Sequence, residues 1–228
     1  MAARAPRPEA GEGHDCVRRR GRPAVLPEAV RRARLIEAAE AIFLERGYAA
    51  ATMDDVAHKA GMSKKTVYQL FDGKADLFRA VLRTQIGSTF GPLPDAADRA
   101  GVEEILRAHL AAFADLLLSP RQIAMTRLII SEAHREPELA EAFRLEALES
   151  CPSELNRWLD RMSAKGLMAV ERPEEATEFL FGAVLGASSI RTLASADLGR
   201  TVEIERAAIE GRINRVVGVF MVMLDGDL

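Results

Sequence analysis

The chain of 228 residues is short of cysteine, of tryptophan and of long apolar runs. Its two cysteines, Cys16 and Cys151, lie far apart in the sequence, which argues against a disulfide framework and favours a reducing cytoplasm. The longest apolar run, residues 216–224, is too short to cross a bilayer, and the first residues contain no apolar core of a secretory signal. We therefore expect a cytoplasmic protein without a membrane partner.

Patterns that would support catalysis or metal binding are also missing from the sequence. The four histidines, His14, His58, His109 and His134, are scattered, and none has a His or Cys partner at metal-ligand spacing. The sequence contains no glycine-rich phosphate loop, no GxSxG motif and no nucleophile beside a plausible base. We predict no catalytic residue, no metal and no cofactor.

The charge is small overall but unevenly divided. The whole chain has a net charge of −3, yet residues 1–82 hold 15 basic and 11 acidic residues, and the remainder holds 16 basic and 23 acidic residues. Only the N-terminal part therefore suits a polyanion, and the acidic remainder argues against a DNA-packaging protein, which would be basic throughout. A hydrophobic content of 48% is ample for a buried core.

Two helix starts stand eleven residues apart within residues 52–77, TMDDVAHKAGMSKKTVYQLFDGKADL. Thr52 can cap the first helix, with Asp55 as the acid of a capping box, and Ser63 can cap the second. Gly61 follows the first helix where a left-handed C-terminal residue is needed, so the chain should turn sharply. The pattern predicts a helix-turn-helix, and the plainer alternative is two ordinary helices joined by a glycine turn.

The second helix of this pair has a basic face that is rich in hydrogen-bond donors. Val67, Leu70 and Phe71 form a stripe that can pack on the first helix. The other side chains should point outward, where they suit the base edges and phosphates of a major groove. They are Lys64, Lys65, Thr66, Tyr68 and Gln69.

A preceding helix, with Leu35, Ile36, Ala39, Ile42 and Phe43 on one side, completes a three-helix unit. Over about residues 31–82 the sequence resembles the TetR (tetracycline-repressor) family of bacterial transcriptional regulators. The resemblance is carried by Ala38, Ala39, Phe43, Gly47, Thr52, Val56, Ala57, Ala60, Gly61, Met62, Ser63, Thr66, Val67, Tyr68, Phe71, Lys74 and Leu77.

This resemblance implies a homodimer with an N-terminal DNA-binding domain and an all-helical C-terminal domain that binds a small molecule. It also implies phosphate contacts from Tyr68 and Lys74, and base reading by the exposed side of residues 63–69. Lys65 and Leu70 depart from the residues frequent in the family, which affects the target sequence rather than the mode of binding. The predicted DNA-contacting residues are Thr52, Ser63, Lys64, Lys65, Thr66, Tyr68, Gln69, Lys74, Arg20 and Arg22.

Residues 1–24 lack periodicity, and we expect them to form a disordered basic arm. Within this arm the sequence Arg20-Gly21-Arg22-Pro23 resembles the core of an AT-hook, whose arginines enter a narrow minor groove. Arg19 stands where that motif usually has a proline. The alternative is a solvated basic tail.

The predicted DNA-binding domain covers residues 25–86, and two glycines and two prolines in residues 87–94 indicate a linker, placed at 87–101. Residues 102–228 have helical apolar spacing throughout. Helices near 173–193 and 203–224 are strongly apolar, and Gly182 and Gly186 would let another helix approach closely. The family resemblance favours pairing of these two helices with their copies in a homodimer, and internal core packing is the alternative.

We also expect the C-terminal domain to hold a cavity for an apolar or amphipathic effector. Large and partly flexible side chains between residues 102 and 170 suit such a cavity, and the alternative is a core that they fill. The candidate ligand-binding residues are His109, Phe113, Met125, Arg127, Phe143, Trp158 and Met162.

The leading hypothesis is an all-α regulator of the TetR type, favoured as a repressor, that binds a palindromic operator in double-stranded DNA as a dimer. A small-molecule effector would release it, and it would be cytoplasmic and nucleoid-associated when bound. The alternative is an all-helical enzyme or small-molecule carrier with a merely structural N-terminal helical pair.

Overall fold

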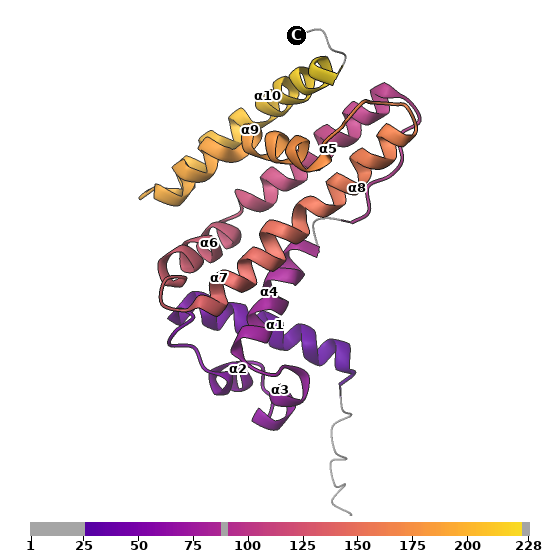
Figure 1. The fold of residues 1–228 in the computed structure, drawn as a ribbon. Helices are drawn as coiled ribbons and strands as arrows, with labels where there is room; N and C mark the ends of the chain where they lie inside the picture. Colours follow the sequence, from indigo (N-terminus) through magenta and orange to yellow (C-terminus); the bar gives the residue numbers. More distant parts are fainter. Residues whose placement is uncertain (1–25, 88–90, 225–228) are drawn as a thin grey trace, which may run out of the picture.

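The computed structural model describes residues 26–87 and 91–224, and no strand occurs within these ranges. This confirms the predicted all-α fold. Figure 1 shows α2 and α3 at one end of the molecule and the last turns of α10 at the other. The helices are α1 (Glu28–Arg46), α2 (Met53–Lys59), α3 (Lys64–Leu70), α4 (Lys74–Gly87), α5 (Arg99–Leu117), α6 (Pro120–Glu132), α7 (Pro137–Phe143), the π-helix η1 (Arg144–Glu149), α8 (Ser150–Ala164), α9 (Pro173–Ala194) and α10 (Leu198–Leu224).

The helix-turn-helix is defined by the residues at the ends of α2 and α3. The Thr52 side chain accepts the Asp55 N–H at 3.1 Å, and the Asp55 carboxylate accepts the Thr52 N–H at 3.1 Å, which completes the capping box. Ser63 accepts the Thr66 N–H at 3.2 Å. Gly61 has a φ of 66°, a conformation that costs glycine little because it has no Cβ. The predicted caps and the predicted turn are therefore confirmed.

A first buried core holds α1 to α4 together. Phe43, Tyr48 and Phe78 meet with ring centroids 5.4, 5.4 and 5.3 Å apart, in tilted and edge-to-face arrangements that aromatic rings favour. The same core includes apolar side chains from α6 and α7, so the first four helices do not close it alone. These side chains are Met125, Ile129, Leu139 and Ala142.

A second buried core lies among α5, α8, α9 and α10. Trp158 is fully buried in it and donates its indole N–H to the Pro94 carbonyl at 2.8 Å. Pro173 begins α9, as predicted, because a first helical residue needs no N–H partner. The helix α5 begins at Arg99, so the last three residues of the predicted linker are helical.

The helices α9 and α10 each keep an apolar face outside the second core. Side chains at helical spacing are exposed on both, and Ile190 is 71% exposed. None of the described helices combines the length and the apolar character that a membrane-spanning helix needs. The exposed faces are formed by Phe179, Gly182, Ala183, Gly186, Ala187 and Ile190 on α9, and by Gly218, Val219, Val222 and Met223 on α10, where Gly218 is half-buried.

Candidate nucleic-acid interface and effector cavity

The outer face of α3 carries the predicted reading residues together. Lys64, Lys65, Tyr68 and Gln69 are exposed, and Thr66 is half-buried, whereas Val67 between them is fully buried. Tyr68 is 48% exposed. The burial of Val67 therefore turns the polar side of α3 outward, at the end of the molecule shown in Figure 1.

Lys64 lies in an ion pair at this face. Its ammonium is 3.0 Å from the Asp54 carboxylate, and each side chain is 62% exposed. The hydrogen bond to Asp54 raises the pKa of Lys64 above its ordinary value. Because exposed pairs of this kind contribute little to stability, a phosphate or base edge can replace Asp54 as the partner of Lys64.

The cap residues Thr52 and Ser63 have their oxygens engaged within the protein. Thr52 also donates its hydroxyl to Asp55 at 2.6 Å, and the Ser63 and Thr66 hydroxyls are 2.9 Å apart. The hydrogen bond from Thr52 is the largest cause of the lowered pKa of Asp55. These two residues therefore shape the ends of α2 and α3.

Lys74, at the start of α4, contacts the loop between α1 and α2. Its ammonium donates to the Tyr48 carbonyl at 2.8 Å and to the Ala49 carbonyl at 3.4 Å, and it lies 4.3 Å from the centre of the Tyr48 ring. The structure thus gives Lys74 a role in holding this loop. Its phosphate contact stays a prediction. Arg20 and Arg22 of the arm lie outside the described residues.

The loop is held from the other side by α6 and α7. The Glu132 carboxylate accepts the N–H of Tyr48 at 3.2 Å and the N–H of Ala49 at 2.7 Å. The Tyr48 hydroxyl donates to Glu138 at 3.4 Å. The segment that leads into α2 is thus connected directly to the C-terminal helices.

A second connection joins the start of α6 to α1. Arg121 donates to both carboxylate oxygens of Glu40, which is buried on α1, and Gln85 of α4 donates to the same carboxylate at 3.1 Å. Because α6 is tied to α1 at its beginning and to the α1–α2 loop at its end, it links the two parts of the chain.

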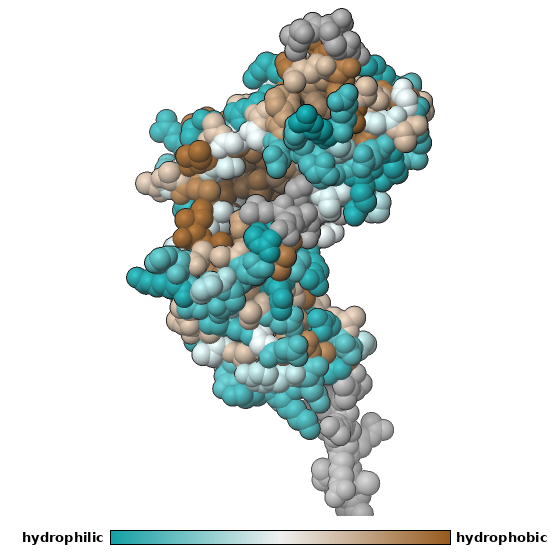
Figure 2. All heavy atoms as spheres, viewed as in Figure 1, coloured by the Kyte–Doolittle hydropathy of each residue, from teal (hydrophilic) through white to brown (hydrophobic). Residues whose placement is uncertain are grey.

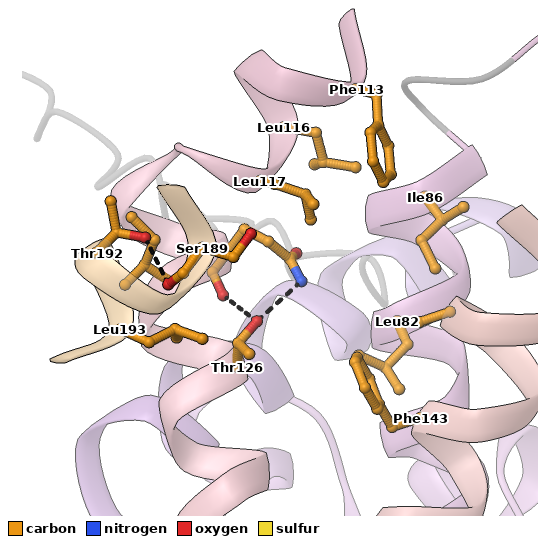
Figure 3. A pocket seen from close by; sticks show the side chains of 13 residues that line it. Leu82, Ile86, Phe113, Leu116, Leu117, Thr126, Phe143, Ser189, Thr192 and Leu193 are labelled. Atoms are coloured by element: carbon orange, nitrogen blue, oxygen red, sulfur yellow. Dashed lines mark hydrogen bonds between the residues drawn. The ribbon is translucent and has the colours of Figure 1, made fainter. Parts of the chain in front are cut away.

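A cavity of about 190 Å³ lies between α4, α5, α6, α7, η1 and α9. Figure 2 shows apolar surface in a hollow about half-way along the molecule, and Figure 3 shows how the side chains surround the cavity. Nine of its thirteen lining residues are apolar. The lining consists of Leu82, Ile86, Phe113, Leu116, Leu117, Gln122, Ile123, Thr126, Phe143, Ala147, Ser189, Thr192 and Leu193.

Phe113 and Phe143 are the predicted ligand residues that line this cavity. Met125 lies in the first core, and Trp158 and Met162 lie fully buried in the second. For these three side chains the alternative of a filled core describes the structure, because each packs among buried neighbours.

The two polar candidates also lie outside the lining. Arg127 donates to the carbonyls of Thr192, Leu193 and Ser195 at 2.8, 3.1 and 2.8 Å, so its guanidinium holds the C-terminal end of α9. His109 is buried, with its ring centre 6.1 Å from that of Phe181, and burial lowers its pKa to about 4. His109 is therefore neutral near pH 7.

Two family profiles match the chain in sequence order. The profile "Bacterial regulatory proteins, tetR family" matches residues 35–81, and "AefR-like transcriptional repressor, C-terminal domain" matches residues 104–223. The chain belongs to the TetR family. It is a DNA-binding transcriptional regulator with a helix-turn-helix, which confirms the resemblance seen in residues 31–82.

Its TetR-family relatives include the transcriptional activator FasR of Mycolicibacterium smegmatis, 34% identical over 157 residues that cover 64% of this chain and 70% of FasR. The regulator SrpR of Pseudomonas putida is 33% identical over 109 residues, which cover 47% of this chain and 49% of SrpR. Among solved structures, the flavonoid-responsive regulator FrrA is 27% identical, with a TM-score of 0.66 over 84% of this chain and 95% of FrrA. A TetR-family regulator from Mesorhizobium loti, 23% identical, shares the fold with a TM-score of 0.68 over 87% of this chain and 98% of that one.

Sequence reasoning missed Arg32 and Glu132 as residues that shape the interface of this TetR-family regulator. Arg32 donates to the Leu70 carbonyl at 2.7 Å and lies 4.4 Å from the centre of the Phe71 ring, so it stabilises the end of α3. A cation at a helix C-terminus is a favoured arrangement. However, Arg32 stands 38 residues before Leu70 and Glu132 stands 84 after Tyr48, so no local spacing signals either contact.

Proposed function

We propose that this TetR-family regulator is a repressor that binds a palindromic operator as a homodimer and leaves it when a small apolar or amphipathic molecule enters the cavity. The match of residues 104–223 to a repressor profile supports repression rather than activation, whereas the relative FasR is named an activator. The protein would act in the cytoplasm, on the nucleoid when bound. The relatives are named as regulators, and we propose no catalytic activity.

One observation carries this proposal, namely that α6 belongs both to the cavity and to the support of the helix-turn-helix. Gln122, Ile123 and Thr126 line the cavity, and Glu132 near the end of the same helix binds the loop before α2. At about 1.5 Å per residue, roughly 14 Å of helix separates Ile123 from Glu132. A ligand that favours a different position of α6 would therefore move the loop that precedes the reading helices.

Such coupling must be reciprocal. If the ligand prefers a geometry that the operator does not, each binds more weakly in the presence of the other, by the same factor. The relevant geometry is the separation of the two copies of α3, because successive major grooves on one side of the duplex are about 34 Å apart.

The exposed apolar faces of α9 and α10 support the homodimer. Small residues on α9, including Gly182 and Gly186, leave room for a second helix, while Val219 and Val222 supply apolar surface on α10. One helix-turn-helix reads few base pairs, so a two-fold pair on a two-fold operator gives the selectivity that a single copy lacks.

At the DNA, we assign base reading to Lys64, Lys65, Thr66 and Gln69. Tyr68 and Lys74 contact phosphates in this proposal, beside the capped helix ends at Thr52 and Ser63. We further propose that the arm residues Arg20 and Arg22 enter the minor groove next to this site, because a basic arm directly precedes the domain.

The full chain can be tested on fragments of its source genome. Purified protein should select a two-fold symmetric site, and compounds from a broad apolar library that raise its thermal stability should weaken binding to that site. In transcription from a promoter that overlaps the site, the protein should lower the transcript level and the compound should restore it.

Two variants separate coupling from binding. Glu132→Gln should still bind the operator but respond less to the compound, whereas Glu104→Gln, at an exposed carboxylate on α5, should respond like the parent chain. A site without two-fold symmetry, or an operator affinity that no stabilising compound changes, would contradict the proposal.

A further inference from the structure

The effector cavity carries no charge among its lining residues. Gln122, Thr126, Ser189 and Thr192 are its polar members, and all four have neutral side chains. Moving an ion out of water without a counter-charge costs several kcal/mol even after the protein relaxes. A ligand held within this lining is therefore uncharged in the part that it buries.

The arginines that adjoin the lining in the sequence are engaged elsewhere. Arg127, next to Thr126, donates to three carbonyls at the end of α9. Arg121, next to Gln122, pairs with Glu40, and Arg191, next to Thr192, pairs with Glu205. The other two follow the same pattern: Arg83 pairs with Glu146, and Arg144 pairs with Glu141. A buried carboxylate would have to break one of these arrangements to gain a cationic partner.

The polar groups are confined to one side of the cavity. All four come from α6 and α9, whereas α4, α5 and α7 contribute only leucine, isoleucine and phenylalanine side chains. In Figure 3, Phe113, Leu116 and Leu117 lie across the cavity from Thr126, with Leu82, Ile86 and Phe143 to one side. The cavity therefore suits an apolar body with its polar group directed toward α6 and α9.

On the polar side, the two threonine oxygens face a ligand as acceptors, and the Gln122 amide makes a long hydrogen bond of 3.5 Å to the Thr126 oxygen. The Thr126 hydroxyl donates to the Gln122 backbone carbonyl at 2.9 Å, and the Thr192 hydroxyl donates to the backbone carbonyls of Ser188 and Ser189 at 2.9 and 3.0 Å. A hydroxyl has one proton, so both threonine oxygens present only lone pairs to a ligand. The complementary ligand group is a donor.

The volume of the cavity and its aromatic lining restrict the class of ligand further. An apolar protein cavity of roughly 150 Å³ accommodates benzene, so about 190 Å³ suits a compact molecule of one or two rings. Phe113 is held by a stacked contact with Phe181, their ring centres 3.9 Å apart, and Phe143 lies on another side of the lining. Flat rings gain additional contact energy against such side chains.

We infer that the effector is an uncharged aromatic compound of one or two rings whose hydroxyl or N–H group donates to Thr126 or Thr192. The inference rests on the proposed function, because it assigns the ligand class of the same cavity. It distinguishes an aryl alcohol or phenol from an aryl or acyl carboxylate, for which the lining supplies no counter-charge.

The test compares naphthalene derivatives that differ only in their polar group, with binding to the full chain measured by calorimetry at pH 7. 2-Naphthol should bind best, 2-methoxynaphthalene about tenfold more weakly because it cannot donate, and 2-naphthoate at least about 100-fold more weakly because it is an anion. Binding of 2-naphthoate as tight as that of 2-naphthol, or no binding of 2-naphthol, would overturn the inference.

Variants locate the donor contact. Thr126→Val and Thr192→Val are tested singly and together. The advantage of 2-naphthol over 2-methoxynaphthalene should disappear in the single variant that removes the accepting threonine and in the double variant. Thr84→Val is the matched control, because Thr84 makes the same kind of backbone hydrogen bond, to Ala80 at 2.8 Å, but is exposed on α4 outside the lining. An unchanged preference in the double variant would place the ligand elsewhere and overturn the assignment.

Operator binding, measured in parallel, separates this inference from the proposed function. If 2-naphthol binds as described but leaves operator affinity unchanged, the ligand class stands and the effector-release proposal fails. If a carboxylate binds in the cavity and releases the operator, the release proposal stands and the ligand class is wrong.

Discussion

A Cβ atom at Gly47 would lie 2.6 Å from an Oε1 oxygen of Glu132, closer than such atoms approach in folded proteins. Glu132 occupies this space because its carboxylate binds the backbone N–H groups of the next two residues, Tyr48 and Ala49. The glycine at the end of α1 and the carboxylate at the end of α6 therefore form one joint between the DNA-reading helices and the rest of the chain.

Gly47→Ala should destabilise the folded chain through this joint. Gly47 has φ 84° and ψ 161°, a backbone conformation almost exclusive to glycine, so we expect a loss of roughly 1–3 kcal/mol in the free energy of unfolding. Part of the loss should arise from displacement of Glu132. In a double-mutant cycle by urea unfolding, Gly47→Ala should thus be less damaging in the Glu132→Ala background, and strictly additive losses would remove Glu132 from the explanation.

Lys74→Ala should lower stability, whereas Lys65→Ala should not. Lys74 donates to two backbone carbonyls, and charged hydrogen bonds of this kind contribute about 1.5–3 kcal/mol. Lys65 is exposed, so its removal should change the free energy of unfolding by less than about 0.5 kcal/mol. On DNA, loss of the phosphate contact that we propose for Lys74 should also reduce the slope of log K against log salt by about one. Equal stability of the two variants would argue against the holding role.

Tyr68→Phe and Gln69→Ala should weaken operator binding in different ways. Loss of the Tyr68 hydroxyl should affect all duplexes alike, because a phosphate contact carries no sequence information. Loss of Gln69 should relax selectivity at one base pair, at a cost of roughly 1–3 kcal/mol for that pair. Selection from a randomised operator distinguishes the two, and an altered consensus for Tyr68→Phe would reverse its assignment.

Val219→Glu on α10 should yield monomers. Val219 is 50% exposed, so the charge is tolerated by the single chain but not in an apolar seam between two copies. Val216 is a less clean probe because it packs partly against the second core of its own chain. Sedimentation of Ile130→Glu provides the control, because Ile130 is 64% exposed on α6 and belongs to neither of the apolar faces of α9 and α10. If Val219→Glu were still a dimer, the dimer interface would have to lie elsewhere.

His109→Gln should make the free energy of unfolding depend less on pH in the acid range. Burial lowers the pKa of His109 to about 4 from an ordinary value of 6.5, so the unfolded chain binds a proton that the folded chain excludes between these values. The free energy of unfolding should therefore fall as the pH drops from 6.5 toward 4. Unfolding measured across this range should show a smaller fall in His109→Gln than in His134→Gln, a change at an exposed histidine. Identical pH profiles would contradict this account.

Glu205 affects the free energy of unfolding at a lower pH than His109 does. Its carboxylate has a pKa lowered to about 2, chiefly by the hydrogen bond from Arg191, so the stability that it supplies above pH 4.5 is lost only as the pH falls toward 2. The two effects can therefore be separated in one titration.

Local signals in the sequence were sufficient for the helix-turn-helix. Thr52 and Asp55 lie three residues apart, as do Ser63 and Thr66, and Gly61 stands directly in the turn, so each contact forms within one helical turn. Backbone geometry at such spacings depends little on the rest of the chain. Pro173 is a local signal of the same kind, because it stands at the start of α9, where the helix near residues 173–193 is predicted.

The cavity was less accessible to sequence reasoning because its composition depends on which helices meet. Arg127 and Met125 stand on α6 close to Thr126, yet they face α9 and the first core respectively, and only Thr126 reaches the cavity. The type of side chain does not tell which of several neighbouring residues on one helix lines the cavity. The rotation of α6 is fixed by partners such as Glu40, which lies 81 residues before Arg121.

The first core has a practical meaning for protein engineering. New genetic switches can be built by exchanging the DNA-binding domains of two family members. Such an exchange assumes that a junction near residue 87 separates two folding units. In this chain that junction would separate Met125, Ile129, Leu139 and Ala142 from the DNA-binding domain and leave apolar surface uncovered on both pieces. A chimaera that keeps α6 and α7 together with α1 to α4 should preserve the packing of the first core. A junction in the linker would instead combine two parts whose core residues do not match.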